Sequence, residues 1–231
     1  MTWVDGCEDR PEEALRANAH GPSVLASYTR QRGIPFVFFS TDYVFDGTEE
    51  HRGPYTERDA TRPLSVYGQS KLEGERAVLR VNPEAAVLRT SWVYGPDAAG
   101  KNFISTLQRM LRNGERMRVP ADQISTPTLN RDLAQAALEL AGAGASGVFH
   151  VTGPGLYSRY DLALEVATFF GLDASLIDGV PTGELRQKAV RPLYSGLVSE
   201  RLATALPGFR MRSLHEGLQA TAEAQAVVAT V

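Results

Sequence analysis

The chain has 231 residues, 43% of them hydrophobic and 22% charged. This composition is typical of a folded globular protein and is too apolar for a disordered one. Its 24 basic and 27 acidic residues leave a formal net charge of −3, so no basic excess favours nucleic acid or an anionic membrane as a partner. The single cysteine, Cys7, excludes an internal disulfide framework and a zinc site built on cysteines.

Targeting and metal-binding patterns are also missing from the sequence. No apolar run is long enough to cross a bilayer, and the first ten residues hold no apolar signal-peptide core. A chain with one cysteine fits a reducing, cytoplasmic location best. The four histidines, His20, His51, His150 and His215, lack metal-ligand spacing, so we expect no metal site. His150 lies in an apolar stretch and is expected to be a core histidine.

The predicted elements alternate between helices and buried strands. In chain order, the patterns predict a helix over 9–32, a strand over 34–39, a polar loop over 46–63, a helix over 65–80, a strand over 85–93, a helix over 102–113, a helix from Asn130, a strand over 147–152 and a helix from Ser158. We expect Asn130 to cap its helix, and Ser158 with Asp161 to form a near capping box. The βαβα order predicts an α/β fold with a doubly wound parallel sheet.

The last third of the chain, from about Gly153, has fewer strands and more helix. We therefore expect two parts. Residues 1–152 carry the sheet. Residues 153–231 form most of a smaller lobe, with segments from the 96–130 region.

Polar and aromatic side chains follow two of the predicted strands. Ser40 to Phe45 follows the first strand, and Arg89 to Gly95 ends the second. Ligands of open parallel sheets bind at the carboxyl ends of the strands. Hydroxyls, carboxylates and large aromatic rings at these positions are well suited to holding a polar, ring-shaped ligand.

Tyr67 and Lys71 are the residues whose spacing carries chemistry. Four residues apart on a helix, they share one face. A tyrosine with a pKa near 10 is a weak acid-base catalyst at pH 7, and a nearby ammonium stabilises its phenolate. The pair suits proton transfer in a carbonyl–alcohol interconversion. By itself the spacing more often describes a half-exposed tyrosine and a solvated lysine. The hydroxyls of Ser40 and Thr41 at a strand end favour the catalytic interpretation.

Several motifs closely resemble those of the dTDP-4-dehydrorhamnose reductases, which are extended short-chain dehydrogenases/reductases. The resemblance extends from residue 2 to about residue 220. The stretches that carry it are Ser40 to Gly47, Pro54 and Tyr55, Pro63 to Glu75, Arg89 to Gly95, Lys101 to Phe103, Asp122 and Gln123 with Pro127 and Thr128, and Arg131 to Ala134. It implies that the predicted sheet is Rossmann-like. It also implies that residues 1–152 are the remainder of an NAD(P)-binding domain that holds the active site, and that residues 153–231 mainly form a substrate-binding lobe.

The resemblance implies three catalytic residues. Tyr67 is the acid that protonates the ketone, and Lys71 lowers its pKa and binds the nicotinamide ribose. Thr41 takes the place of the serine of the usual triad and polarises the ketone. Thr2, Tyr67 and Lys71 are expected at the cofactor, which is NADPH or NADH.

The resemblance also implies a set of substrate contacts. Asp42 and Tyr43, together with Thr41, match sugar-contacting positions, and Trp92 stacks on the sugar ring. Asn102 and the nearby arginines face the nucleotide diphosphate, although a solvated helix face explains the arginines equally well. These arginines are Arg109, Arg112, Arg116 and Arg118. Asn18 matches a family asparagine and is expected to be structural.

The glycine-rich turn that seats the cofactor pyrophosphate in this family is not found in these residues. The match begins just past the family's fourth strand, so about 60 residues, at ~30 per βαβ unit, are not represented. A literal G-x-G-x-x-G at Gly142 to Gly147 follows a helix and precedes a strand, which is the wrong context. We expect these 231 residues alone to bind NAD(P)H weakly.

The expected function is the NAD(P)H-dependent reduction of a nucleotide-linked 4-keto-6-deoxysugar, as in dTDP-rhamnose or related deoxysugar biosynthesis. The expected partner is a dTDP-linked keto-deoxyhexose, and a homodimer is left open. One alternative is a non-catalytic, dinucleotide-binding regulatory subunit like the β subunit of methionine adenosyltransferase. Another is an inactive fragment. The intact set of Thr41, Tyr67 and Lys71 favours the enzyme.

Overall fold

A three-stranded parallel sheet forms the centre of the larger part of the molecule. The computed structural model describes residues 1–97 and 99–229. The strands β1 (Val37–Thr41), β2 (Ala86–Thr90) and β7 (Gly147–His150) lie in the order β1–β2–β7. Every residue of the central strand β2 is buried. This confirms the expected parallel sheet and its fully buried strand.

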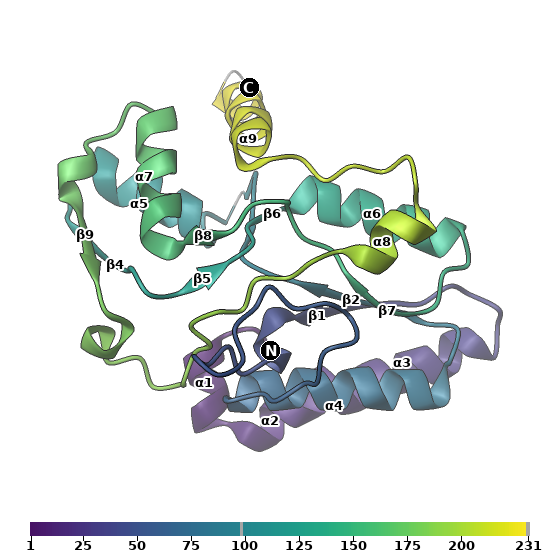
Figure 1. Cartoon of the computed structure of the whole chain (residues 1–231). Coiled ribbons are helices and arrows are strands. Elements are labelled where there is room, and N and C mark those ends of the chain that lie inside the picture. The colour runs from purple at the N-terminus through teal and green to yellow at the C-terminus, as the bar shows by residue number, and fades with distance from the viewer. Residues whose placement is uncertain (98, 230–231) are drawn as a thin grey trace.

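Helices cover both faces of this sheet (Figure 1). One face carries α1 (Val4–Asp9), α2 (Pro11–Leu15), a π-helix (Arg16–His20), α3 (Gly21–Arg30) and α4 (Val66–Val81), and the other carries α6 (Asn130–Gly142) and α8 (Glu200–Ala205). Successive β2 side chains point to opposite faces, so Val87 packs with Val78 of α4 while Leu88 packs with Leu140 of α6. The arrangement is the predicted doubly wound α/β fold.

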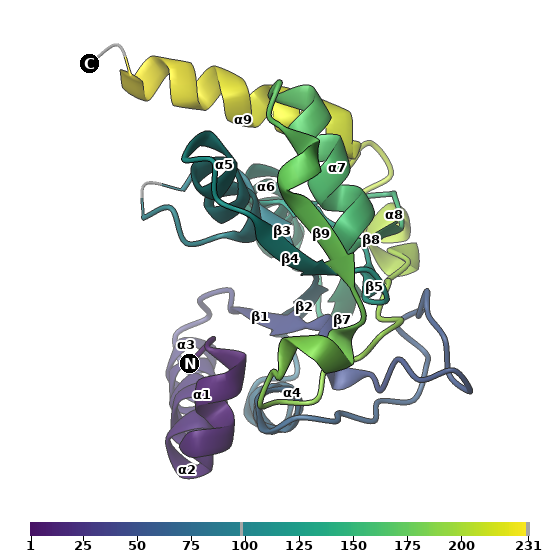
Figure 2. The same cartoon turned by 90° about the vertical axis from the view of Figure 1, so that its left-hand side faces the viewer.

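A second hydrophobic core lies in a smaller lobe beside the carboxyl edge of the sheet (Figure 2). Its elements are β3 (Val93–Tyr94), α5 (Phe103–Arg112), β4 (Met117–Pro120), β5 (Ile124–Ser125), β6 (Thr128–Leu129), β8 (Tyr157–Ser158), α7 (Arg159–Phe169), β9 (Ile177–Val180) and α9 (Leu214–Ala229), with short 3-10 turns at Ala174–Leu176 and Thr182–Leu185. Between α7 and α9 the chain returns to the sheet, where Leu202 and Met211 join the core above β2.

The helix predicted over 9–32 is interrupted in the structure. It begins at Pro11, passes through a π-helical turn at Arg16–His20 and continues to Arg30. Pro22 has no N–H to donate, and its ring would clash with the carbonyl of Asn18, four residues earlier, in a regular α-helix. The wider π turn takes up this conflict just before the proline.

Strand boundaries also differ from the prediction. β1 starts at Val37 rather than Ile34, because Pro35 cannot donate a ladder hydrogen bond. It extends through Thr41, which pairs with Thr90 of β2. β2 ends at Thr90 because Trp92 has a φ of 42°, which turns the chain out of the strand. β7 ends at His150, before the predicted Thr152.

One cap prediction is wrong and another is confirmed. Asn130 is the first residue of α6 and not its cap; its side-chain nitrogen donates to the carbonyl of Pro96 at 2.9 Å. Ser158 caps α7 by accepting from the Asp161 N–H at 2.9 Å. The literal glycine motif at 142–147 connects α6 to β7, as its context predicted.

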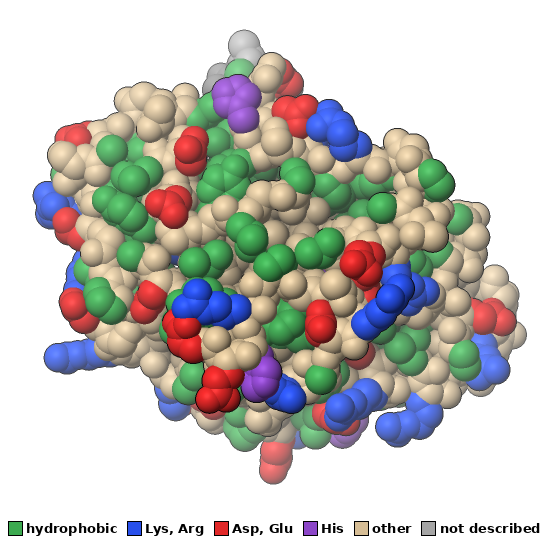
Figure 3. Space-filling model, viewed as in Figure 1, with side chains coloured by type: hydrophobic (Ala, Val, Ile, Leu, Met, Phe, Trp, Pro, Cys, Tyr) green, Lys and Arg blue, Asp and Glu red, His purple; other side chains and the backbone are tan. Residues whose placement is uncertain are grey.

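Charged side chains of both signs are interspersed over the face shown in Figure 3. This agrees with the nearly balanced charge of the sequence. Within the described part of the chain, no helix is both long and apolar enough to cross a membrane.

A buried ion pair fixes α4 against the sheet. Arg89 of β2 donates to both carboxylate oxygens of Glu75 on α4, at 3.0 and 2.7 Å. Ser40 of β1 donates to the same carboxylate at 2.5 Å. The side chains of Arg89 and Glu75 are only 6% and 3% exposed. Because removal of one partner leaves the other charge buried and unpaired, the pair constrains where α4 can lie.

Glu75→Ala is expected to destabilise the fold by about 3–5 kcal/mol, since it strands the Arg89 guanidinium in the core. The double variant Glu75→Met with Arg89→Met removes both charges and should recover most of that loss, because apolar side chains of similar volume replace the pair. Urea unfolding of the parent and both variants measures this. A single variant with the parent's unfolding midpoint would show that the pair does not constrain α4.

Candidate active site

The predicted polar residues meet at the carboxyl end of the sheet. Thr41 is the last residue of β1, and Asp42 opens the short 3-10 turn that follows it. Ser91 comes directly after β2, and its hydroxyl lies 3.0 Å from the Asp42 carboxylate. Residues that follow two parallel strands are therefore in contact.

Tyr67 lies in the first turn of α4, close to Thr41 and Tyr43. Ser65 caps the helix by accepting from the Gly68 N–H at 3.2 Å. The rings of Tyr43 and Tyr67 meet edge to face, with their centroids 5.7 Å apart. A Cβ on Gly68 would stand 2.2 Å from the carbonyl oxygen of Tyr43. The glycine that follows Tyr67 thus allows the helix to approach the end of β1.

Burial dominates the electrostatics of Tyr67. Loss of water raises the pKa of the phenol well above its usual value of 10, and a hydrogen bond with Thr41 acts weakly in the opposite direction. Burial outweighs the other influences on this pKa, and the lowering expected from Lys71 stays a prediction. Tyr67 is consequently protonated at neutral pH and can act as a proton donor.

Lys71 lies one turn after Tyr67 on α4. Its ammonium group donates to the carbonyl oxygen of Phe39 at 2.5 Å and sits 4.1 Å from the centre of the Phe38 ring. Burial lowers the pKa of Lys71 to about 8, against a smaller opposing effect of Glu75. An ammonium group can donate three hydrogen bonds, so this one has donors left for a ligand.

Asp42 is buried under a set of hydroxyl groups from four segments of the chain. Its carboxylate accepts from Thr41 at 3.1 Å, Ser91 at 3.0 Å, Ser125 at 3.2 Å and Ser195 at 2.6 Å. Burial raises the pKa of Asp42, and these hydrogen bonds oppose the effect. The Asp42 carboxylate thus has hydrogen-bond donors from both lobes. Its contact with the sugar stays a prediction.

Trp92 contacts an arginine that the sequence analysis did not identify. The guanidinium of Arg159 lies 3.6 Å from the centre of a Trp92 ring and 4.7 Å from that of Phe103. One face of the indole is therefore covered, and a sugar can reach only its remaining surface. Arg159 follows the predicted cap Ser158, which is the one local signal that placed it at the start of a helix.

An open cleft of about 490 Å³ lies between the lobes, next to Tyr43. Its lining includes four basic side chains: Lys101, Arg118, Arg159 and Arg191. Of the arginines predicted at the diphosphate, only Arg118 lines this cleft. Arg109 and Arg112 are exposed on α5, and Arg116 pairs with Asp178 at 2.5 Å. Arg191, which the sequence analysis missed, is held by Asp5 at 2.9 and 3.0 Å.

Two other residues that were predicted to contact ligands, Asn102 and Thr2, are not in the lining of this cleft. Asn102 caps α5 by accepting from the Ser105 N–H at 3.0 Å, and its amide donates to Gly95 at 3.1 Å. Thr2 is exposed beside Met1. The roles of Asn102 in substrate binding and of Thr2 in cofactor binding stay predictions.

Two structural expectations are confirmed. Asn18 donates to the hydroxyl of Ser70 on α4 and to the Met1 carbonyl, both at 2.9 Å. His150 is fully buried, and its Nδ1 lies 3.1 Å from the Tyr55 carbonyl. Burial lowers the pKa of His150 to about 3, so it is a neutral core histidine.

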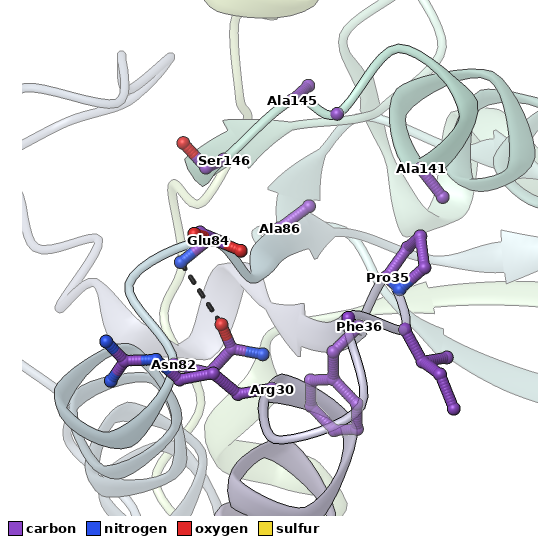
Figure 4. A pocket seen from close by; sticks show the side chains of 12 residues that line it. Arg30, Pro35, Phe36, Asn82, Glu84, Ala86, Ala141, Ala145 and Ser146 are labelled. Carbon is purple, nitrogen blue, oxygen red and sulfur yellow. Dashed lines mark hydrogen bonds between the residues drawn. The ribbon is translucent and has the colours of Figure 1, made fainter.

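Another hollow, of about 180 Å³, lies at the opposite end of the sheet (Figure 4). Phe36, Ala86 and Ser146 line it where the strands begin, together with Asn82 and Glu84. Parallel sheets bind their ligands at the carboxyl ends of the strands. The cleft beside Tyr43 and Tyr67 is therefore the candidate active site.

The doubly wound sheet, with a helix that carries tyrosine and lysine beside a strand-end threonine, defines a Rossmann-type reductase of the extended short-chain dehydrogenase/reductase class. The model of the RmlD substrate binding domain matches residues 1–227. The chain belongs to this family.

Two relatives show the extent of the match. The chain is 40% identical over 199 residues to a probable low-salt glycan biosynthesis reductase of Haloferax volcanii, and the match covers 85% of the chain. It is 41% identical over 208 residues to the dTDP-4-dehydrorhamnose reductase of Mycobacterium tuberculosis, covering 88% of the chain. The chain spans about two thirds of these relatives' lengths, 66% and 68% respectively.

Solved structures agree with the fold. A dTDP-4-dehydrorhamnose reductase from Clostridium acetobutylicum matches with a TM-score of 0.89 and 36% identity, over 97% of this chain and 78% of that one. One from Bacillus anthracis, solved in complex with NADP, matches with a TM-score of 0.89 and 32% identity over the same shares, 97% and 78%.

Gly68→Ala is expected to destabilise the fold by about 1–3 kcal/mol, because the new methyl group must push the start of α4 away from the Tyr43 backbone. Gly142→Ala is the matched control: nothing lies within 4 Å of a Cβ there, and alanine suits the end of α6 better than glycine. Urea unfolding of both variants measures the effect. Equal stability of the two variants would contradict the close approach.

Proposed function

We propose that the chain reduces the ketone of a nucleotide-linked 4-keto-6-deoxysugar, with NADPH or NADH as the reductant. The observation that carries this proposal is the buried phenol of Tyr67 beside Thr41, with Lys71 one turn away, next to a cationic cleft. The names of relatives support the substrate class, since they include dTDP-4-dehydrorhamnose reductases and a dTDP-4-keto-6-deoxy-D-glucose reductase.

Lys71 provides the fit for the nicotinamide end of the cofactor. Among the described residues its ammonium group has one hydrogen bond, to Phe39, and Lys71 lies on the same helix face as Tyr67. The hydroxyls of a ribose suit its remaining donors. The cofactor, when bound, supplies the hydride that reduces the ketone carbon.

Tyr67 supplies the proton in this proposal. Reduction of a ketone creates an alkoxide, which must be protonated, so the catalytic acid has to be neutral beforehand. Burial raises the pKa of Tyr67 and keeps it neutral. The positive charge of Lys71 on the same face then stabilises the phenolate that remains after transfer.

Thr41 polarises the ketone by turning its hydroxyl. In the structure this hydroxyl donates to Asp42 at 3.1 Å and accepts from the Tyr43 N–H at 3.2 Å. A hydroxyl has one proton, so donation to a ketone oxygen requires release of the Asp42 carboxylate. Asp42 tolerates this because serine hydroxyls still donate to it: Ser195 at 2.6 Å, and one of Ser91 and Ser125, which share a hydrogen bond of 2.5 Å with each other.

The basic lining of the cleft supports a nucleotide diphosphate as the charged part of the substrate. A cytoplasmic location is part of the proposal and rests on the single cysteine of the sequence. Assembly as a homodimer stays a prediction.

Tyr67→Phe should lower kcat by at least ~10²-fold while affinity for the cofactor stays near normal, because proton donation contributes to the transition state. The assay follows NADPH oxidation with a dTDP-linked 4-keto-6-deoxysugar, in a protein that contains these residues and is extended at its N-terminus if cofactor binding requires it. Tyr28→Phe is the control, since Tyr28 is exposed on α3.

Near-parental turnover of Tyr67→Phe would remove Tyr67 from the catalytic role. Binding of NADPH and nucleotide sugar by the parent without any turnover would replace the enzyme by the regulatory interpretation.

The rate of reduction should fall as the pH rises through about 8, the pKa to which burial lowers Lys71. Below this pH the ammonium is charged and favours the phenolate; above it the charge is lost while Tyr67 stays protonated. Lys71→Arg keeps its charge, so its pH profile should lose this limb. An unchanged limb in Lys71→Arg would assign the titration to another group.

A further inference from the structure

Three residues of α4 contact three consecutive residues at the end of β1. Tyr67, Lys71 and Glu75 follow one another at intervals of four residues, so they lie along one face of the helix. Their respective partners in the strand are the Thr41 hydroxyl, the Phe39 carbonyl and the Ser40 hydroxyl. The contact of Tyr67 with Thr41 therefore depends on the register of the whole helix face against β1.

The apolar contacts between α4 and the sheet do not fix this register. Val78, which follows Glu75 on α4, packs with Phe38 and Val87 in a hydrophobic cluster. Such contacts are non-directional, and their free energy follows the area removed from water, so a small slide of the helix changes it little. A hydrogen bond weakens steeply when its distance or angle changes. The polar contacts of α4 therefore determine its register against β1.

The hydrogen bond of Glu75 constrains the register more than that of Lys71. Lys71 ends a flexible four-carbon stem, which can keep its bond to the Phe39 carbonyl while the helix moves. Glu75 accepts from Ser40 at 2.5 Å and from two nitrogens of Arg89 at 3.0 and 2.7 Å. Its carboxylate is thus held at both oxygens and from two strands at once.

Burial makes this arrangement unfavourable to change. Ser40 is 5% exposed and Glu75 is 3% exposed. A hydroxyl or carboxylate that loses its partner at such a place cannot form a hydrogen bond with water instead. Ser40 also lies between Phe39 and Thr41 in the strand, so a displacement of Ser40 moves both of these neighbours.

We propose that Glu75 is a positioning residue for the proton transfer, because its bond to Ser40 fixes α4 against β1 and so places Tyr67 at Thr41. This inference rests on the proposed function for the reaction that it serves. A displacement of reacting groups by about 1 Å can lower a rate by ~10²-fold. Glu75 thereby affects kcat through Ser40 and Arg89, without contributing a group to the reaction.

Two double variants separate positioning from stability. Arg89→Met with Glu75→Gln and Arg89→Met with Glu75→Met are both uncharged at this place, but only the glutamine offers Ser40 an acceptor. The glutamine variant should be no more stable than the methionine variant, since its amide N–H groups are buried without their own partner. Its kcat should nevertheless be at least ~10-fold higher, with similar KM values.

Turnover of these variants is compared at each variant's own pH optimum, because both lack the carboxylate that raises the pKa of Lys71 against the effect of burial. The comparison is repeated in the Tyr67→Phe background. There the glutamine and methionine variants should have equal turnover, since the hydroxyl that Glu75 positions is missing. A purely structural role of Glu75 would keep the difference between them.

Crystal structures of the two double variants give a measurement that requires no turnover. The separation of the Tyr67 and Thr41 hydroxyls should stay parental in the glutamine variant. It should grow by about 1 Å in the methionine variant, because Ser40 has lost its acceptor there.

Ser40→Ala tests the strand side of the same contact while Glu75 and Arg89 stay paired. Its kcat should fall by at least ~10-fold, with KM near the parental value. Thr221→Val is the matched control, since it removes a buried hydroxyl that donates to the Gly217 carbonyl at 2.8 Å within α9. This helix lies on the far side of the small lobe from α4 (Figure 2), and the turnover of the control should equal that of the parent.

Equal turnover of the two double variants, or lower turnover of the glutamine variant, would overturn the inference. Parental kcat in Ser40→Ala would overturn it as well, as would an unchanged separation of Tyr67 and Thr41 in the methionine variant. If the parent itself shows no turnover, the proposed reaction fails, and the separations in the two crystal structures still decide the positioning role.

Discussion

The carboxylate of Asp42 is the group on which the geometry of the site depends. It accepts hydroxyl hydrogen bonds from Thr41, Ser91, Ser125 and Ser195, which come from the ends of β1 and β2, from β5 and from the segment before α8. A buried carboxylate must be satisfied or lose its charge. The need to satisfy one charge thus brings four segments to the same point, and the catalytic groups are placed around it.

The parts of the structure that depend on neighbours in sequence could be predicted. Tyr67 and Lys71 share a helix face because of their spacing, and Ser158 caps α7 because Asp161 lies three residues later. The apolar runs predicted the strands, and β2 is buried throughout as expected, while Phe39 of β1 is exposed. Their ends shifted by a few residues where Pro35 or the φ of Trp92 overrides the apolar pattern.

The parts that depend on distant contacts could not be predicted. Ser125 and Ser195 lie 83 and 153 residues from Asp42, and no local pattern links them to it. Asn130 looks like a cap, yet its amide is directed to Pro96 instead. Arg159 had no motif of its own; only the packing of α7 against Trp92 and Phe103 reveals it. Both the hydroxyl cluster at Asp42 and the position of Arg159 against two aromatic rings are properties of the assembled lobes.

The ion pair between Arg191 and Asp5 gives the cleft a connection to the first helix. Arg191 lines the cleft, and Asp5 holds it from α1, with the Ala189 N–H donating to the same carboxylate at 2.9 Å. An anion that draws the Arg191 guanidinium away from Asp5 would weaken this ion pair, and binding of the anion in the cleft would then be coupled to the docking of α1. Such coupling is reciprocal: loosening α1 would change affinity for the anion, and the anion would change the hold on α1.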